Sequence, residues 1–457
     1  GLKIRGGERY GINVSDNCSN IRISNCDISG WGRLGVLNET EGAYIKDGAK
    51  VNYDAGILLL NADNVTVERC YIHKSNAKTN AWHSKTWEDV HPKGSCGIYY
   101  SVKDKVVIRY NDIIGTNSNR FNDSIEGANN DSRLGGAARN TDIYGNMLYM
   151  GEDDGLEIDG GQMNARVYKN RIEQFYCGIS TAPAGAGPAY IFRNVITNLG
   201  NSYNGGTHAA IKSGGYLSVG GEDKYIGKLM LFNNTIDSYA YGIANTNYAG
   251  SSEFHSISRN NIFADRTKTR AGFKNIFSGE EDDNNYDLVS GKYDTGTNNA
   301  LEKNGIITSA MPSYINQTGG NLRLGALSVG KGGGTYVENF CEKSSDCLGA
   351  YAGLGENEFF PNRPADMYAD RYNVVLKDKE SQRINVHFGA TGAGAFKLLS
   401  DNEWIRVENI SGSGAENCDI SFDLSLDMSK AAEGEKNGML ILRLDNGWSI
   451  PITVQNK

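Results

Sequence analysis

Residues 155–196 read GLEIDGGQMNARVYKNRIEQFYCGISTAPAGAGPAYIFRNVI. The pattern apolar-x-x-Asn-x-apolar occurs here twice, around Asn170 and around Asn194, and a small residue followed by an aliphatic one precedes each copy, at Gly155-Leu156 and at Gly178-Ile179. Apolar residues at a spacing of two are typical of strands, whereas a helical repeat would place them three or four apart. The stretch therefore predicts a repeating unit of about 24 residues that is made of short strands and tight turns.

Both patterns recur through the first 260 residues. The polar position of the first pattern is occupied in turn by Cys26, Cys70, Asn111, Asn146, Asn170, Asn194, Asn234 and Asn260. The pair of small and aliphatic residues begins at Gly11, Gly56, Gly97, Ser124, Gly155, Gly178, Ala210 and Gly242. We interpret each unit as two strands per turn of a right-handed parallel β-helix, an all-β fold in which neighbouring coils bury each other's apolar side chains. The asparagines would form a buried ladder, and Cys26 and Cys70 would be buried free thiols at the same position.

The composition agrees with strands joined by tight turns, because the 457 residues include 57 glycines but only 7 prolines. The formal charge of −8 provides no basic excess for phosphate groups, so we expect no nucleic-acid partner. No apolar run is long enough to span a membrane. The eight cysteines contain no CxxC pair that would indicate a zinc site, and Cys341 and Cys347 are near enough in sequence to form a local disulfide.

The segments 107–113, 155–172 and 187–196 resemble the pectate-lyase-like right-handed β-helix proteins, and the resemblance covers roughly residues 1–355. Asn321-Leu-Arg-Leu and Leu348-Gly-Ala-Tyr resemble the closing segment of secreted members. The resemblance implies the fold but leaves the reaction open, because this superfamily includes lyases, hydrolases, esterases and non-catalytic adhesins. We expect a secreted, periplasmic or cell-surface location.

We divide the chain into a β-helix at 1–365, with coils to about 265 and a closing segment at 266–365, and an antiparallel, Ig-like β-sandwich at 366–457. The segments 403–407, 411–414 and 451–455 resemble a BACON-type domain, which accompanies carbohydrate enzymes of gut Bacteroidetes. Leu2-Lys3-Ile4 already has the pattern of a ladder strand, so we expect additional coils or a domain upstream. We expect a monomer.

The repeat also predicts which side chains point outward, because the residue after each buried aliphatic one faces solvent. This outward column consists of Asn13, Leu58, Tyr99, Glu126, Glu157, Ser180, Lys212 and Ala244. Glu126 and Glu157 would lie in adjacent coils, close enough to repel each other, with Lys212 two coils further on. With Asp154 they are our candidate catalytic residues. Acids on the same strands make Asp123, Asp153, Asp154 and Asp159 candidate ligands for Ca²⁺.

Three chemistries fit this arrangement. In a glycoside hydrolase the two glutamates would serve as nucleophile and acid/base. In a polysaccharide lyase the acids would hold Ca²⁺ against a uronate carboxylate while Lys212 or an arginine removes the α-proton. Neighbouring carboxylates, however, would raise the pKa of a lysine and oppose its action as a base. The third possibility is a structural Ca²⁺ that only stiffens the coils.

The longest insertions, residues 31–54, 73–95 and 115–122, leave one corner of the coils and would form the walls of a cleft. Exposed aromatic side chains suit the faces of sugars, so we expect a polysaccharide or other glycan as the partner. Our candidate substrate-binding residues are Tyr99, Trp82, Trp87, His91, Arg133 and His208. The rival hypothesis is a non-catalytic glycan-binding or structural β-helix, in which loops seal the acids and Arg133 and Arg139 neutralise them.

Overall fold

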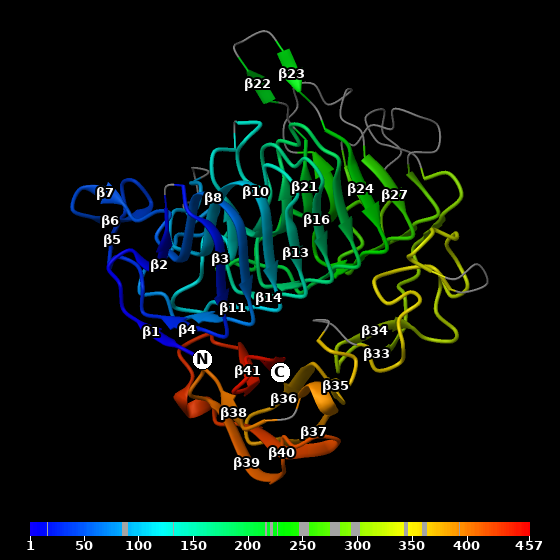
Figure 1. Ribbon diagram of the computed structural model, residues 1–457. Helices are drawn as coiled ribbons and strands as arrows, with labels where there is room; N and C mark the ends of the chain where they lie inside the picture. The colour runs from blue at the N-terminus through cyan, green and yellow to red at the C-terminus, as the bar shows by residue number, and fades with distance from the viewer. Residues whose placement is uncertain are drawn as a thin grey trace.

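The computed structural model describes the chain from residue 1 to residue 457 apart from residues 16, 85–89, 131, 215–216, 220–222, 226, 246–255, 275–283, 294–301, 342–345, 359–362 and 393. Its larger part is a parallel β-helix, and a small sandwich lies against one side of it (Figure 1). Nowhere in the described part of the chain is there a helix of the length and hydrophobicity that a membrane crossing requires.

The β-helix has three rows of parallel strands. The first row, which carries the pairs of small and aliphatic residues, contains β2 (Tyr10–Val14), the first half of β8 (Ala55–Glu68) and of β10 (Cys96–Arg109), β12 (Ile125–Gly127), β15 (Asp154–Glu157), β18 (Cys177–Thr181), β21 (Ala209–Ser213), β26 (Tyr241–Asn245) and β29 (Phe273–Lys274). The second row contains β3 (Ser19–Ser24), the second halves of β8 and β10, β13 (Asp142–Tyr144), β16 (Ala165–Tyr168), β19 (Ala189–Phe192), β24 (Leu229–Phe232), β27 (Ser256–Arg259) and β30 (Asn284–Asn285).

The third row is an 11-stranded sheet. It runs through β1 (Lys3–Arg5), β4 (Asp27–Ser29), β9 (Tyr71–His73), β11 (Asp112–Ile114), β14 (Met147–Tyr149), β17 (Arg171–Glu173), β20 (Val195–Thr197), β25 (Thr235–Ser238), β28 (Ile262–Asp265), β31 (Leu288–Ser290) and β32 (Ile306–Thr308). The parallel pairing thus continues beyond residue 265. β1 pairs with β4, so the expectation that the chain begins in a ladder strand is confirmed.

The expectation of two strands per turn was wrong, because the asparagine pattern spans two strands rather than one. In the coil around Asn170, β16 ends at Tyr168 and β17 begins at Arg171. Lys169, between them, has a φ of 54°, so the chain turns a corner there in the left-handed region. The apolar residues on the two sides of each asparagine therefore belong to different rows.

The asparagine ladder is confirmed for Asn111, Asn146, Asn170, Asn194 and Asn234, all of which are fully buried. Each side-chain amide donates to the side-chain oxygen of the next asparagine at 2.8–3.1 Å, and the same oxygen accepts a backbone N–H. The sixth member is Asn261 rather than Asn260. Asn260 occupies the corner, with a φ of 61°, and its side chain binds the backbone of Thr335.

The cysteine expectations are also confirmed. Cys26 and Cys70 are buried free thiols, and the backbone N–H of Cys70 donates to Asn111 Oδ1, which extends the ladder by one coil. Cys341 and Cys347 form a disulfide.

The ladder ends on a pair of acids. The side chain of Asn261 donates to Asp287 Oδ1 at 3.0 Å. The backbone N–H of Asp287 in turn donates to Glu302 Oε1 at 3.2 Å. Burial, followed by the charge of Asp287, raises the pKa of Glu302 to about 9. The raised pKa favours the protonated form of Glu302 in the native protein.

Small antiparallel pieces decorate the coils. They are β5 (Val36–Asn38), β6 (Ala43–Lys46) and β7 (Ala49–Lys50) in the first insertion, β22 (Leu217–Val219) with β23 (Asp223–Tyr225), and β33 (Tyr314–Asn316) with β34 (Asn321–Leu324).

The C-terminal domain is a sandwich of two four-stranded sheets, in the orders β35-β37-β40-β39 and β36-β42-β41-β38. Their strands are β35 (Met367–Ala369), β36 (Asn373–Leu376), β37 (Ser381–Phe388), β38 (Phe396–Leu399), β39 (Ile405–Gly412), β40 (Cys418–Leu426), β41 (Asn437–Leu444) and β42 (Ser449–Asn456), with 3-10 turns at Ala390–Gly392 and Met428–Lys430. All pairs are antiparallel except β36 with β42. Phe388, Trp404 and Phe422 fill the core.

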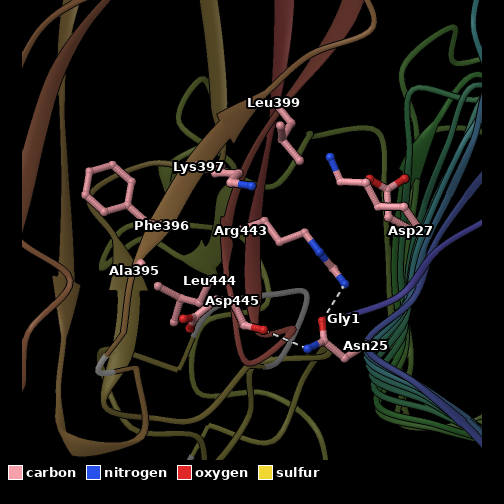
Figure 2. A pocket seen from close by; sticks show the side chains of 11 residues that line it. Gly1, Asn25, Asp27, Ala395, Phe396, Lys397, Leu399, Arg443, Leu444 and Asp445 are labelled. Carbon is pink, nitrogen blue, oxygen red and sulfur yellow. Dashed lines mark hydrogen bonds between the residues drawn. The ribbon is translucent and has the colours of Figure 1, made fainter.

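The sandwich packs on the outer side of the 11-stranded sheet. Met439 and Ile441 of β41 lie against Tyr71, Met147 and Tyr149. A second contact is polar and buried. The hydroxyl of Ser449 donates to the Asp112 carboxylate, and Arg363, just before the sandwich, pairs with the same carboxylate at 2.7 Å and donates to the carbonyl oxygen of Ser449 at 2.8 Å. Near the first coils the interface leaves a pocket of about 160 Å³, lined by Asn25, Asp27, Phe396, Lys397 and Arg443 among others (Figure 2).

We predict that Arg363→Met lowers the free energy of unfolding by about 3–5 kcal/mol, because it leaves the Asp112 carboxylate buried without its counter-charge. Adding Asp112→Leu should recover most of the loss, since the uncompensated charge is then removed. Urea unfolding of the two variants and the parent measures both effects. Equal stability of the parent and the Arg363→Met protein would contradict this account of the interface.

We further predict that Glu302 makes the protein less stable as pH rises from about 4.5 to about 9. In that window the unfolded chain releases the proton of Glu302 while the native protein retains it, so unfolding becomes easier with pH. Glu302→Gln has no proton to release at this position. Its free energy of unfolding should therefore decrease with pH by about 1.4 kcal/mol per pH unit less than that of the parent. Urea midpoints across this pH range test the difference, and parallel curves would refute it.

Candidate active site

The strand register confirms that the residues of the outward column lie side by side, but the expectation that they face solvent is wrong for most of them. The buried members are Leu58, Glu126, Glu157, Ser180 and Ala244. Tyr99 pairs with Glu126, Glu157 pairs with Ser180, and Ser180 pairs with Lys212. Ile125 pairs with Leu156, which places Glu126 and Glu157 side by side on β12 and β15. Gly155 comes directly before Leu156, and packing requires a glycine there. A Cβ on Gly155 would lie 2.4 Å from Ile172 Cγ2 and 2.8 Å from the carbonyl oxygen of Gly178.

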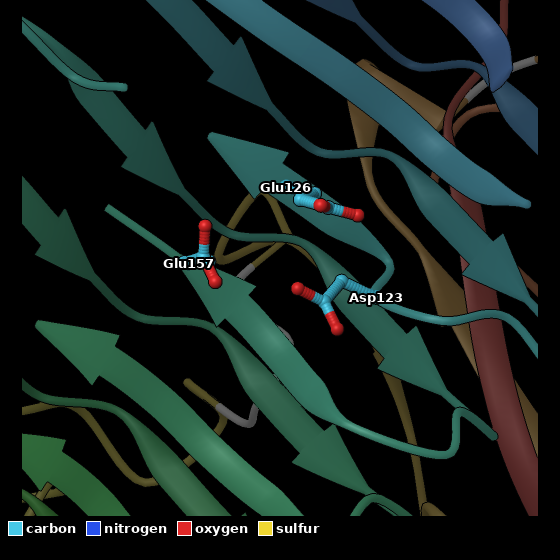
Figure 3. Close-up of side chains that lie close together, drawn as sticks. All are labelled: Asp123, Glu126 and Glu157. Atoms are coloured by element: carbon cyan, nitrogen blue, oxygen red, sulfur yellow. The ribbon is translucent and has the colours of Figure 1, made fainter. Parts of the chain in front are cut away.

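Three carboxyl groups converge on the outer side of these strands. In Figure 3 the side chains of Asp123, Glu126 and Glu157 approach one another from neighbouring coils, and their ligand atoms lie within 4.8 Å of one another. Asp123, Asp153 and Asp154 form a second group of the same kind, so Asp123 belongs to both. We call these five residues the acid cluster. Glu157 is the most exposed member, at 7%, and Asp154 is completely buried.

Hydrogen bonds fix one oxygen of several of these carboxylates. Glu126 Oε2 accepts from Cys96 Sγ at 2.6 Å and from Asn122 Nδ2 at 3.0 Å. Glu157 Oε1 accepts from Asn130 Nδ2 at 2.9 Å. The sequence analysis missed Cys96, Asn122 and Asn130. Cys96 could have been found from the register, because it occupies the position in its coil that Asp123 and Asp154 occupy in the next two.

Lys212 is the cation of the cluster, with its Nζ 2.5 Å from Asp154 Oδ2. The second oxygen of Asp154, Oδ1, is buried and has no hydrogen-bond partner among the described residues. Asp159 belongs to neither group of acids, because its Oδ1 accepts from Ser180 Oγ at 2.8 Å and from the backbone nitrogen of Ala182 at 2.7 Å. Arg133 and Arg139 are exposed, and Lys212 forms an ion pair with Asp154 of the cluster.

Burial is the main cause that raises the pKa of these acids. The pKa of Glu126 is raised to about 7, that of Asp154 to about 6, and those of Asp123 and Glu157 well above their usual range. Neighbouring carboxylates add to the effect for Asp123 and Glu157. Burial opposes the charge of Lys212, but Asp154 and Asp153 outweigh it and raise the lysine pKa, as the sequence analysis anticipated.

Aromatic loop residues cover one side of the cluster. Trp82 Nε1 donates to Asp153 Oδ1 at 2.7 Å, and His91 Nε2 lies 3.4 Å from Asp153 Oδ2. Beside the Trp82 loop, a pocket of about 490 Å³ is lined by Tyr44, Asn80, Tyr203 and neighbouring residues. Trp82 and His91 of the 73–95 insertion therefore cover one side of the acids, which are buried.

The remaining candidates for substrate binding are placed as follows. Tyr99 stacks on Tyr53 with ring centroids 4.7 Å apart, at the other end of the pair of glutamates. Tyr176 lies one coil beyond the cluster and His208 two coils beyond it, with their ring centroids 6.2 Å apart. Trp87 lies outside the described residues. Tyr53 belongs to the 31–54 insertion that was expected to form a wall of the cleft, whereas the sequence analysis did not include Tyr176.

The acid cluster has the ligand atoms that a hard divalent cation would need. Ca²⁺ takes carboxylate oxygens as ligands, and Asp123, Asp153 and Asp154 bring such atoms together beside the unpartnered Asp154 Oδ1. These three residues are the best candidates to hold the ion, with Glu126 and Glu157 beside them.

One known protein family matches this fold, and the matched residues include the site. A family model described as a right handed beta helix region matches residues 3–221, which include the whole acid cluster and Lys212. No curated protein and no solved structure matches the chain. Together with the parallel sheets, the match defines the fold as a right-handed parallel β-helix.

We predict that Glu157→Gln stabilises the protein at pH 8 in the presence of a chelator. The raised pKa of Glu157 makes the parent lose stability as pH rises above about 4.5, and an amide removes that penalty. With Ca²⁺ in excess the order should reverse, because the parent gains more from the ion than the variant does. Urea unfolding measures both conditions, with the exposed Glu433→Gln as the control.

Proposed function

We propose that this protein is a polysaccharide lyase that cleaves uronate-containing glycans with the help of a divalent cation such as Ca²⁺. The observation that carries the proposal is the contact of Lys212 with Asp154, which places an amine at the edge of a buried carboxylate cluster. A cluster of this kind would hold a cation, and the amine beside it would meet a substrate bound to that cation.

A bound Ca²⁺ would neutralise the uronate carboxylate and so make the α-proton next to it more acidic. The side chain of Lys212 is 19% exposed, so its Nζ can face a substrate while Asp154 orients it. Without a cation, the acids beside Lys212 favour its protonated form. In the β-elimination, Lys212 Nζ would accept the proton from C5 of the uronate only after a cation held by those acids had neutralised them and the ammonium had released its own proton to solvent. The electron pair would form the C4–C5 double bond as the C4–O bond breaks, and the leaving oxygen would take a proton from solvent.

The ring-bearing walls support a carbohydrate rather than a small anion. Trp82 and Tyr99 flank the cluster on opposite sides and are both partly exposed. The sandwich with its resemblance to BACON-type domains, and the disulfide between Cys341 and Cys347, support a secreted, periplasmic or cell-surface carbohydrate enzyme.

A glycoside hydrolase is the second candidate, because Glu126 and Glu157 would supply two carboxyl groups at the separation of a retaining pair. The pKa of Glu126, raised to about 7 by burial, would suit a general acid/base. The non-catalytic alternative needs acids that are neutralised within the protein. It is weakened by the unpartnered Asp154 Oδ1 and by the exposed positions of Arg133 and Arg139.

We predict that the protein releases unsaturated uronates from at least one polymer in a panel of polygalacturonate, alginate and chondroitin sulfate, with Ca²⁺ present. Absorbance of the C4–C5 double bond and reducing ends should rise together, whereas a hydrolase would raise reducing ends alone. Lys212→Gln should lower kcat by about 10³-fold or more with little change in KM, because the proton acceptor is lost. Lys103→Gln, an exposed lysine on β10, is the matched control. Cleavage without the double bond would replace the lyase by the hydrolase.

A further inference from the structure

Beyond the acid cluster, partly exposed rings follow one corner of the β-helix for three coils. We call Trp82, His83, Tyr176, His208 and Tyr241 the aromatic strip. Centroid distances join its members in order: Trp82 to Tyr176 at 5.8 Å, Tyr176 to His208 at 6.2 Å, and His208 to Tyr241 at 6.2 Å. His83 lies beside the first step, 5.8 Å from Tyr176.

The backbone keeps these rings in line. The N–H of His208 donates to the carbonyl of Tyr176 at 2.9 Å, and the N–H of Tyr241 donates to the carbonyl of His208 at 3.0 Å. The three residues thus belong to successive coils, which are about 4.8 Å apart. Tyr176 and His208 immediately precede β18 and β21, and Tyr241 is the first residue of β26. These three strands follow β15 of the acid cluster in the sheet. The strip therefore extends the site along the axis of the β-helix.

The rings of the strip are not core residues of the corner. Phe175, immediately before Tyr176, is fully buried in the main hydrophobic core. Tyr176, His208, Tyr241 and Trp82 remain half-buried, and His83 is exposed. A side chain with an apolar face open to solvent and a polar tip is the kind that packs against a sugar ring.

The two ends of the strip indicate what lies along it. At one end, Trp82 Nε1 is hydrogen-bonded to Asp153 of the acid cluster, so a chain bound to the cluster would reach the strip without a gap. At the other end, the guanidinium of Arg270 lies 4.9 Å from the ring centroid of Tyr241. A cation there suits a glycan whose units carry carboxylates.

We propose that the aromatic strip binds the pyranose rings of an acidic glycan over the three coils that follow the acid cluster, with Arg270 near the far end. This inference rests on the proposed function, because it assumes that the same glycan chain occupies the acid cluster. It adds the direction of the chain, which lies parallel to the axis of the β-helix and runs from β15 toward β26.

Native gels that contain polygalacturonate or alginate test the strip apart from catalysis. The Lys212→Gln background prevents cleavage during the run. In this background the protein should be retarded by at least one of the two polymers, and Tyr241→Ala should weaken the retardation about fivefold to tenfold. Tyr241→Phe keeps the ring and should bind as the parent does. Tyr336→Ala removes a tyrosine that is 43% exposed in the closing segment, and should also leave binding unchanged.

The outcomes separate the two proposals. Weaker retardation of Tyr241→Ala, with Tyr241→Phe and Tyr336→Ala unchanged, supports the strip even if no polymer yields unsaturated products, in which case the lyase proposal alone fails. Equal retardation of Tyr241→Ala and its parent overturns the strip, even if the protein proves to be a lyase. Absence of retardation by both polymers also overturns it.

Discussion

The hydrogen bond between asparagine side chains of successive coils is the constraint on which the rest of the structure depends. Each amide is fully buried, and each oxygen accepts from both a side chain and a backbone N–H of the preceding coil. A slip of one residue would leave buried polar groups without partners, which costs about 1–3 kcal/mol for each group. Because successive strand residues face opposite sides, the register fixed by the ladder also places Glu126, Glu157 and Lys212 in one outward column.

The acid cluster uses the same stacking of coils for the opposite purpose. Neutral amides one coil apart attract each other, whereas carboxylates one coil apart repel and are further penalised by burial. Cys96, Asn122 and Asn130 relieve part of this penalty by donating to Glu126 and Glu157, and Lys212 compensates Asp154. The repulsion that remains uncompensated would be relieved by protonation or, under the proposed function, by a bound cation. The buried, mutually repelling carboxyl groups lower the stability of the coils at this site.

The sequence was sufficient to predict the parts of the fold and site that repeat. The ladder, the outward column and the buried thiols of Cys26 and Cys70 all follow from residues that recur once per coil. Asn260 was assigned to the ladder in place of Asn261 because two asparagines are adjacent there, and the left-handed corner favours asparagine as well. The third row of strands was missed because strands such as β17 have three residues, too few to show alternation.

Contacts between distant segments could not be predicted in this way. Trp82 and Asp153 are 71 residues apart, and Arg363 and Asp112 are 251 residues apart. No period in the sequence relates their positions, since each pair is brought together by the closure of a loop or by the packing of one domain on another. The sequence did indicate that the 73–95 insertion lies beside the acids, but it could not predict that Trp82 contacts Asp153.

The buried Arg363–Asp112 contact has a consequence for how the molecule meets its surroundings. It holds the sandwich on the 11-stranded sheet, while the acid cluster lies on a different row of strands. Together with the contact of Met439 and Ile441 with the coils, the Arg363–Asp112 contact holds the sandwich in one orientation. Whatever surface or polymer the sandwich holds would therefore keep a constant direction relative to the acids. The orientation of the β-helix toward an insoluble matrix would then be fixed by the packing of the two domains, and not by the random motion of a flexibly linked domain.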